Sequence, residues 1–189
     1  HDDPFRQFEI WFVEAAASDP EPYAMVLSTV DQQGRPRGRN LLLRGVDTGF
    51  VFYTNYGSAK AAAMDATGLG ALTFRWFEVH RQVHVEGTVA RVDEAFSDEY
   101  FANRPRENQL GAWASRQSSR IESRQVLLAE LDRLDVRYRD RPIPRPDFWG
   151  GYRLTPERIE FWQGQPNRLH DRLRYDRHAD GWGRTVLSP

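Results

Sequence analysis

Two segments of the chain carry the apolar stripe of an amphipathic helix. The first opens with Asp3, which can cap a helical turn, and with Pro4, which suits the first helical position. Its apolar residues recur at helical spacing: Phe5, Phe8, Phe12 and Ala15. The stripe of the second segment consists of Leu127, Leu131, Leu134 and Tyr138. The pattern therefore predicts an N-terminal helix over residues 1–17 and a second helix around residues 127–138.

Short apolar or alternating runs, separated by turn residues, predict antiparallel strands. The runs are 24–30, 37–44, 50–54, 70–76, 82–92, 151–154 continuing into 159–162, 169–175 and 182–187. Tight turns at 31–34 and 47–49 favour a meander over βαβ units. Short helices are expected at 58–66 and from Asp93 to about Asn103, where Pro105 stops the chain from continuing as a helix. This pattern predicts a mainly β fold with helical additions, a small closed or split β-barrel.

The length of 189 residues suits one domain, in which folding buries roughly 70% of the surface of the unfolded chain. We therefore expect residues 1–189 to form a single domain. A stiff, proline-rich connector at 141–146 leads into the C-terminal strands of residues 141–189.

Charge and composition exclude several classes of protein. The net charge of −1 argues against a general binder of nucleic acid or membrane surfaces, which would carry a basic excess. The absence of cysteine excludes disulfides, a thiolate nucleophile and cysteine-ligated metals. No run approaches the roughly 18 apolar residues of a membrane span, and the first residues are not a signal peptide. We expect a soluble, cytoplasmic protein.

Common catalytic and metal-binding motifs are also missing. There is no glycine-rich phosphate loop of the Walker or dinucleotide type and no Gly-x-Ser-x-Gly motif. His80 and His84 are four residues apart on a predicted strand, a separation of about 13 Å that is too long for one metal ion. We expect no metal site.

Polar clusters beside strand ends are the candidates for binding. Of the 26 basic residues, 25 are Arg and one is Lys60; GC-rich codon usage explains much of this bias, and Arg also binds phosphate or carboxylate through its planar fork. The clusters are 39–44, 53–60, 104–106 with 111–118, and 160–164 with 168–172. Together they supply several cations, aromatic planes and one imidazole, a combination that suits a flat, anionic organic ligand.

In and around these clusters are runs by which the chain resembles the pyridoxamine/pyridoxine 5′-phosphate oxidase family of FMN enzymes, which have the split-barrel fold. The runs are Val51–Asn55, Arg81–Val83, Ser115–Ser119, Trp149–Tyr152, Glu160–Gly164 and Arg168–Arg172. The resemblance covers nearly the whole chain, from Pro4 to Pro189. It implies a C2 homodimer with FMN in the cleft between subunits, so that each site mixes residues of two chains. It also implies a basic and aromatic N-terminal segment, which would lie before His1.

The resemblance assigns roles residue by residue. Cations on the FMN phosphate would be Arg39 and Lys60, and the hydrogen-bonding shell would be Tyr53, Thr54, Gln117 and Ser118. Residues that hold the isoalloxazine ring would be Gln82, Trp162 and Arg172. The substrate phosphate would meet Arg44, Tyr100, Arg104 and Asn108, and the residues placed over the pyridine ring would be Arg168 and His170.

Three of these positions depart from the usual family pattern. Arg44 stands where Lys is usual, Ala59 where a second cation beside Lys60 is usual, and Asn108 where a small hydroxyl residue is common. Loss of one cation predicts weaker FMN binding by roughly one to two decades, since a charge-assisted bond contributes about 1.5–3 kcal/mol.

The expected activity is oxidation of pyridoxamine or pyridoxine 5′-phosphate to pyridoxal 5′-phosphate. A hydride would leave C4′ of the substrate for N5 of FMN, and O2 would reoxidise the flavin and give hydrogen peroxide. Arg168 and His170 would orient the substrate and ease proton loss from its C4′ substituent. Two alternatives stay open: a related flavin oxidase acting on another flat anion, as in phenazine-type pathways, and a flavin or B6-phosphate binding protein with little catalysis.

Overall fold

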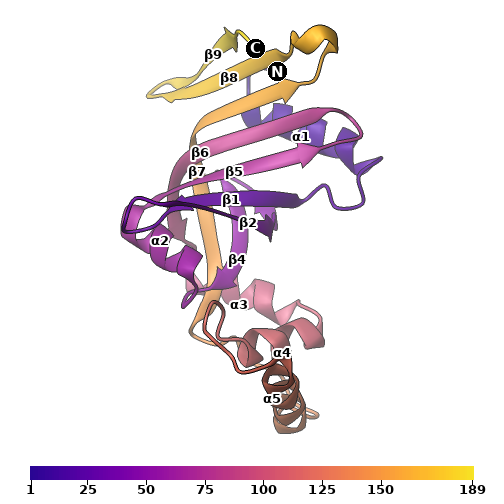
Figure 1. Cartoon of the computed structure of the whole chain (residues 1–189), viewed down its shortest axis with the longest axis vertical. Coiled ribbons are helices and arrows are strands. Elements are labelled where there is room, and N and C mark those ends of the chain that lie inside the picture. The colour runs from indigo at the N-terminus through magenta and orange to yellow at the C-terminus, as the bar shows by residue number, and fades with distance from the viewer.

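The computed structural model describes residues 1–189 and contains one antiparallel sheet of nine strands (Figure 1). The strands are β1 (Ala24–Val30), β2 (Pro36–Leu42), β3 (Gly45–Val46), β4 (Phe50–Asn55), β5 (Leu69–Trp76), β6 (Arg81–Arg91), β7 (Trp149–Gln163), β8 (Asp171–His178) and β9 (Gly181–Leu187). Their order is β2-β1-β5-β6-β7-β4-β3, with β8 paired to β7 and β9 paired to β8. The predicted mainly β architecture is confirmed, with one strand more than expected because the two-residue β3 carries no sequence signal.

Five α-helices accompany the sheet: α1 (Pro4–Ala16), α2 (Ala59–Thr67), α3 (Glu94–Ala102), α4 (Arg106–Ala114) and α5 (Arg124–Arg137). Asp3 caps α1 as expected, since its carboxylate accepts the Phe5 N–H. Ser58 caps α2, and its hydroxyl accepts the Ala61 N–H. Asp93 occupies the N-cap position of α3 but makes no side-chain capping bond.

Helix α4 was not predicted from the sequence pattern. Pro105 ends α3, as expected, but it also serves as the N-cap residue of α4, so the chain turns and starts a new helix at once. Only Gln109 and Leu110 of this nine-residue helix are buried, so it carries no readable apolar stripe. Its helical state therefore depends on packing against α5, the helix it contacts most closely.

The main hydrophobic core lies between α1 and the curled sheet. It includes Phe8, Phe50, Phe74 and Trp76, whose rings meet at centroid distances of 5.0–6.0 Å. A smaller core lies under α3, α4 and α5, at the lower end of the molecule in Figure 1. Its buried members are Phe101, Leu110, Leu134, Tyr138, Ile143 and Trp149. This second core fixes the three helices against the start of β7.

Strand β7 is the longest strand and connects the two ends of the molecule. Its first half pairs with β4 and its second half with β8, while β6 runs beside both. The two predicted runs, 151–154 and 159–162, form this one strand despite Pro156, because the register shifts at Glu86–Gly87 and Pro156 faces Gly87 there. A Cβ on Gly87 would lie 2.0 Å from the Thr155 carbonyl oxygen, so this approach requires glycine.

The segment before β8 differs from its prediction. The strand expected at 169–175 begins only at Asp171, because a 3-10 turn at Pro166–Arg168 precedes it. Asn167 and Arg168 have φ values of +61° and +63°, the left-handed region that residues other than glycine rarely adopt. The turn places Arg168 and His170 in a loop rather than in the strand.

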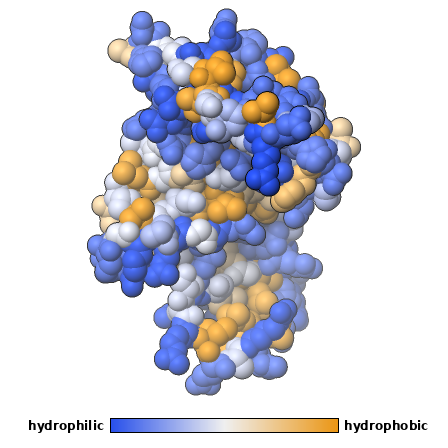
Figure 2. Space-filling model, turned by 45° about the horizontal axis from the view of Figure 1, so that its top comes forward, coloured by the Kyte–Doolittle hydropathy of each residue, from blue (hydrophilic) through white to orange (hydrophobic).

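The face drawn in Figure 2 is largely hydrophilic and carries separate hydrophobic patches, one of them at its lower end. Among the exposed apolar side chains are Val126, Leu128 and Val136 of α5. Such patches mark candidate contact surfaces. No helix of the structure combines the length and the apolar character needed to cross a membrane.

Candidate active site

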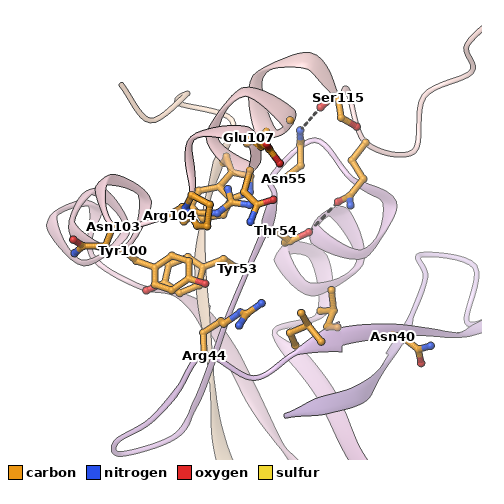
Figure 3. A pocket seen from close by; sticks show the side chains of 18 residues that line it. Asn40, Arg44, Tyr53, Thr54, Asn55, Tyr100, Asn103, Arg104, Glu107 and Ser115 are labelled. Carbon is orange, nitrogen blue, oxygen red and sulfur yellow. Dashed lines mark hydrogen bonds between the residues drawn. The ribbon is translucent and has the colours of Figure 1, made fainter. Parts of the chain in front are cut away.

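A cavity of about 670 Å³ opens between the β2–β3 segment, β4, and the helices α3 and α4 (Figure 3). Six of the predicted site residues line it: Arg44, Tyr53, Tyr100, Arg104, Asn108 and Thr54. Gln117, from the loop after α4, lines it as well. Seven predicted residues from four separate stretches of sequence therefore meet in one cavity.

A buried lysine lies next to this cavity. Lys60, in the first turn of α2, is only 7% exposed. Its ammonium donates to Gln117 Oε1 at 2.8 Å and to Thr54 Oγ1 at 3.3 Å, and no carboxylate pairs with it. Burial, with a smaller contribution from the positive charge of Arg39, lowers the pKa of Lys60 to about 8. A cation held this way, without a counter-charge, is arranged to receive an anion.

Arg39 supplies a second cation close to Lys60. Its Nη1 donates to the Leu27 carbonyl at 3.0 Å and to Thr29 Oγ1 at 2.8 Å, and it forms no ion pair. Burial, with a smaller contribution from the neighbouring Arg37 charge, lowers the pKa of Arg39. Two positive groups without an acid beside them match the charge of a phosphate dianion.

Ser118 lies beside the start of α2, near Lys60. Its hydroxyl accepts the Ala59 N–H at 3.3 Å, and its own φ of +72° turns the 115–119 loop toward the helix. The backbone N–H groups of a helix N-terminus add a favourable dipole for an anion. Ala59 stands where the family usually has a second cation, and it contributes only its backbone N–H to this site.

The other half of the cavity combines stacked aromatic rings with two arginines. Tyr53 and Tyr100 stack at 3.8 Å with an angle of 7° between rings, and Tyr53 also stacks on Trp149 at 5.3 Å. The Arg104 guanidinium lies 4.5 Å from the centre of the Trp149 ring. In the view of Figure 3, Arg104 and Arg44 lie on opposite sides of the tyrosine pair.

Arg104 also has an unsatisfied donor. Its Nη1 is buried and has no hydrogen-bond partner, and burial lowers the pKa of its guanidinium. A buried, unpaired guanidinium nitrogen is costly unless a ligand accepts its proton. The one carboxylate in the cavity lining, Glu107, is exposed and pairs with neither arginine. Burial raises the pKa of Tyr53 to about 12, so its hydroxyl remains a donor at neutral pH.

A second group of predicted residues lies on the outer face of the sheet. Gln82 of β6, Trp162 of β7 and Arg172 of β8 are direct partners in adjacent strands, so their side chains form one row. Arg172 makes a bidentate ion pair with Glu160, at 2.8 and 3.0 Å, which raises its pKa. The structure thus brings these three residues together, as the resemblance implied.

Arg168 and His170 lie beside this row. The His170 ring is 4.6 Å from the Trp162 ring, and its Nδ1 accepts the Gln165 N–H at 3.1 Å. A neutral His170 therefore carries its proton on Nε2. Arg168 is exposed and has no ion-pair partner. The left-handed backbone of Arg168 is a local strain of the kind that clusters at functional sites.

Within one chain, the cavity and this row are far apart. Trp149, at the start of β7, lines the cavity, whereas Trp162 lies at the other end of the same strand. Thirteen residues of extended strand have a contour length of up to about 40 Å. The two groups therefore lie near opposite ends of β7, which connects the lower and upper parts of the molecule in Figure 1.

Two residues that shape the cavity, Trp149 and Asn55, had no predicted role, although both belong to runs shared with the family. The stacking of Trp149 on Tyr53 arises only when β4 and β7 pair. Asn55 donates through Nδ2 to the Ser115 carbonyl at 3.1 Å and accepts the Gly57 N–H at 2.8 Å, which fixes the 115–119 loop against β4. The signal for Asn55 was its place in the cluster 53–60, directly after the predicted strand 50–54.

The two groups suit two different kinds of ligand chemistry. The cavity end offers cations without counter-charge and hydroxyl or amide donors, which suit a phosphate. The row on the outer face offers an indole plane, an amide and a guanidinium, which suit a flat heterocycle with polar edges. The structure contains no group of three or more His, Cys, Asp or Glu side chains that could hold a metal ion together.

Comparisons with known proteins identify the family of the chain. Residues 13–138 match the family described as "Pyridoxamine 5'-phosphate oxidase", and residues 149–189 match the "Pyridoxine 5'-phosphate oxidase C-terminal dimerisation region". A protein of Rubrobacter xylanophilus named pyridoxine/pyridoxamine 5′-phosphate oxidase is 58% identical over 99% of this chain and 87% of its own length. A Synechocystis protein of the same name is 51% identical over 100% of this chain and 89% of its own length.

Solved structures of related proteins have the same fold as this chain. PhzG from Burkholderia lata 383, in complex with tetrahydrophenazine-1-carboxylic acid, has a TM-score of 0.94 at 30% identity and covers 100% of this chain and 94% of its own. An FMN-binding protein of Nostoc punctiforme, related to pyridoxamine 5′-phosphate oxidase, has a TM-score of 0.77 at 18% identity, with 98% of each chain covered. The predicted split-barrel fold is confirmed, and with the match over residues 13–138 the chain belongs to the pyridoxamine 5′-phosphate oxidase family.

Proposed function

We propose that the protein oxidises pyridoxamine 5′-phosphate or pyridoxine 5′-phosphate to pyridoxal 5′-phosphate, with FMN as cofactor and O2 as the acceptor that becomes hydrogen peroxide. The observation that carries the proposal is the set of cations without carboxylate partners beside one cavity: Arg39, Arg44, Lys60 and Arg104. Two phosphate groups, one of the cofactor and one of the substrate, would use all four. Membership of the oxidase family supports the reaction class.

The cofactor would be held at both of its ends. Arg39 and Lys60 would bind the FMN phosphate, with Tyr53, Thr54, Gln117 and Ser118 completing its shell. Gln82, Trp162 and Arg172 would hold the ring. FMN, when bound, would supply hydride acceptance and the reaction with O2.

The chain would hold the substrate by its phosphate and its ring. Arg44, Tyr100, Arg104 and Asn108 would clamp the phosphate, which fixes where the C4′ carbon lies. Arg168 and His170 would cover the ring. The Nε2–H of His170 can donate to a ring substituent, and the fixed charge of Arg168 favours loss of a proton from the C4′ substituent.

The active unit would be a homodimer with FMN between the subunits. The match of residues 149–189 to a dimerisation region supports this, because that region contains Trp162, Arg168, His170 and Arg172. The separation of up to about 40 Å along β7 supports it as well. In a dimer the outer-face row of one protomer could meet the cavity of its partner.

The proposal is tested by the absorption spectrum of the purified protein, recorded before and after anaerobic addition of pyridoxine 5′-phosphate. We expect flavin bands that bleach on addition, and hydrogen peroxide on admission of air. Unphosphorylated pyridoxine is the control. Flavin bands without bleaching would favour a binding protein with little catalysis, and the absence of flavin after reconstitution with FMN would overturn the proposal.

A second candidate is a flavin oxidase that acts on another flat anion. The observation in its favour is the TM-score of 0.94 to PhzG, whose structure holds a tetrahydrophenazine carboxylic acid. A carboxylate carries less charge than a phosphate dianion and needs fewer cations. The two arginines of this cavity, Arg44 and Arg104, would therefore be enough to bind a carboxylate. Comparing kcat/KM for pyridoxine 5′-phosphate and for a dihydrophenazine carboxylate distinguishes the two functions.

Replacing Arg104 should weaken substrate binding. We expect Arg104→Met to raise KM for pyridoxine 5′-phosphate about 30-fold, since one charge-assisted contact contributes about 2 kcal/mol. The value of kcat should change little, because the phosphate contact is the same in the ground state and the transition state. Steady-state kinetics with unphosphorylated pyridoxine give the control, and an equal loss on both substrates would contradict the role.

FMN binding should depend on pH through Lys60. Burial lowers the pKa of Lys60 to about 8 in the free protein, so the side chain is an ammonium only below that pH. Above it, Lys60 must take up a proton before it can pair with the FMN phosphate. Above pH 8 the FMN dissociation constant should rise by about tenfold per pH unit. Fluorescence titrations between pH 7 and 9.5 measure this rise, and a flat profile would contradict it.

The stability of the apoprotein should instead increase with pH. Its unfolded state binds more protons than its folded state between pH 8 and 10.5, so the free energy of unfolding rises across that range.

A further inference from the structure

One arginine lies in the row on the outer face and has no role in the site as described so far. Arg75 of β5 is the direct partner of Gln82, so the row runs Arg75, Gln82, Trp162 and Arg172 across four adjacent strands. The alternation of burial along β5 places its side chain on the outer face, because its neighbours Phe74 and Trp76 are fully buried. Arg75 therefore lies on the surface proposed to hold the flavin ring.

Arg75 is held firmly in this position. Its Nη1 donates to the Trp76 carbonyl at 3.0 Å and to the Arg81 carbonyl at 2.9 Å. Its guanidinium lies 4.6 Å from the centre of the Phe77 ring and 5.5 Å from that of Trp162. These contacts fix the side chain at the end of the β5–β6 hairpin and leave Nε and Nη2 without an acceptor in the chain.

The charge of Arg75 is the uncompensated one in its row. Arg172 makes its bidentate ion pair with Glu160, so the two charges offset each other. Gln82 and Trp162 are neutral. Arg75 has no carboxylate within ion-pair distance, and the nearby Arg81 pairs with Glu14. The net positive charge of the row therefore comes from Arg75.

We propose that Arg75 is a further positioning and tuning residue of the flavin site: it fixes the Trp162 indole and supplies the positive potential that favours a negatively charged, reduced ring. The inference rests on the proposed function, since it requires a flavin at this row. A fixed cation beside a flavin stabilises its anionic form. Among the residues of the row, the pairing with Glu160 leaves Arg75 as the main source of that effect.

The test measures sulfite binding to the FMN-loaded dimer. Sulfite adds to N5 of an oxidised flavin and leaves a negative charge on the ring, so its dissociation constant reports the local positive potential. We expect Arg75→Gln to raise this constant about 5- to 10-fold, as loss of one partly solvated charge at short range predicts. Arg75→Lys should stay within about twofold of the wild type, because it keeps the charge.

Arg177→Gln is the matched control. Arg177 also lies over a tryptophan, 5.5 Å from the Trp182 ring, and has no ion-pair partner, but it is outside the row. The substitution Arg177→Gln should leave sulfite binding unchanged. Melting temperatures of all three variants separate charge from structure, since a purely structural role of Arg75 would make both its variants less stable and leave the sulfite constant of the folded fraction unchanged.

The outcomes also separate this inference from the proposed function. If the wild-type protein retains no FMN, the proposed function fails. If the wild type binds FMN and sulfite, and Arg75→Gln binds sulfite as tightly, the role of Arg75 is overturned while the proposed function stands. Equal weakening of sulfite binding in Arg75→Gln and Arg75→Lys would likewise overturn the electrostatic role of Arg75.

Discussion

Lys60→Met should bind FMN about 150-fold more weakly than the wild type. The substitution removes a buried cation that only Gln117 and Thr54 contact, and loss of one partner of a buried charge pair costs about 3 kcal/mol. The same change should stabilise the apoprotein by about 1 kcal/mol, which raises its melting temperature by about 2–4 °C, because an uncompensated buried charge disappears. Fluorescence titration with FMN and thermal unfolding without it measure the two effects.

The opposite signs of these two effects make the prediction specific. A merely structural lysine would give a less stable protein that binds FMN weakly because it is partly unfolded. Arg37→Met is the control, since Arg37 lies on the same strand as Arg39 but is exposed and paired with Asp31. Unchanged FMN affinity in Lys60→Met would remove Lys60 from the cofactor site.

Arg168→Met should lower kcat for pyridoxine 5′-phosphate by at least about 100-fold while FMN stays bound. Positioned groups that assist proton transfer contribute about 10²- to 10⁴-fold, and Arg168 is an unpaired cation held in a strained turn next to the Trp162–His170 pair. FMN should be retained because the proposed phosphate ligands lie at the far end of β7. Turnover per bound flavin, measured as peroxide production, is the relevant quantity.

Arg177→Met is the matched change at an exposed arginine of β8 without an ion pair, and it should leave turnover unchanged. Full turnover by Arg168→Met at full flavin occupancy would exclude Arg168 from the chemistry. A loss of bound FMN in parallel with activity would instead assign Arg168 to the cofactor.

Local sequence signals anticipated most of the secondary structure. The Asp3 cap and the stripe through Phe8 and Ala15 predicted α1 to within three residues at its start and one at its end, because capping and helical periodicity act over a few positions. Helix α4 was missed for the converse reason: nine residues after a proline carry too little pattern, and packing on α5 decides their conformation. The residue runs of the oxidase family identified the candidate site residues, while their grouping in space was not readable from the chain.

What the sequence determined by itself was the family, the alternation that makes strands, and the identity of the charged and aromatic groups. Tertiary structure decided which of these groups meet. Pairing of strands distant in sequence aligns Gln82 with Trp162, places Glu160 against Arg172 and brings Arg75 into their row. It also puts Lys60 in a buried position without an acid and keeps the cavity and the row at opposite ends of β7. The physical reason is that hydrophobic burial and hydrogen-bonding register act between segments that are far apart along the chain, so charge balance and distance exist only once the sheet has formed.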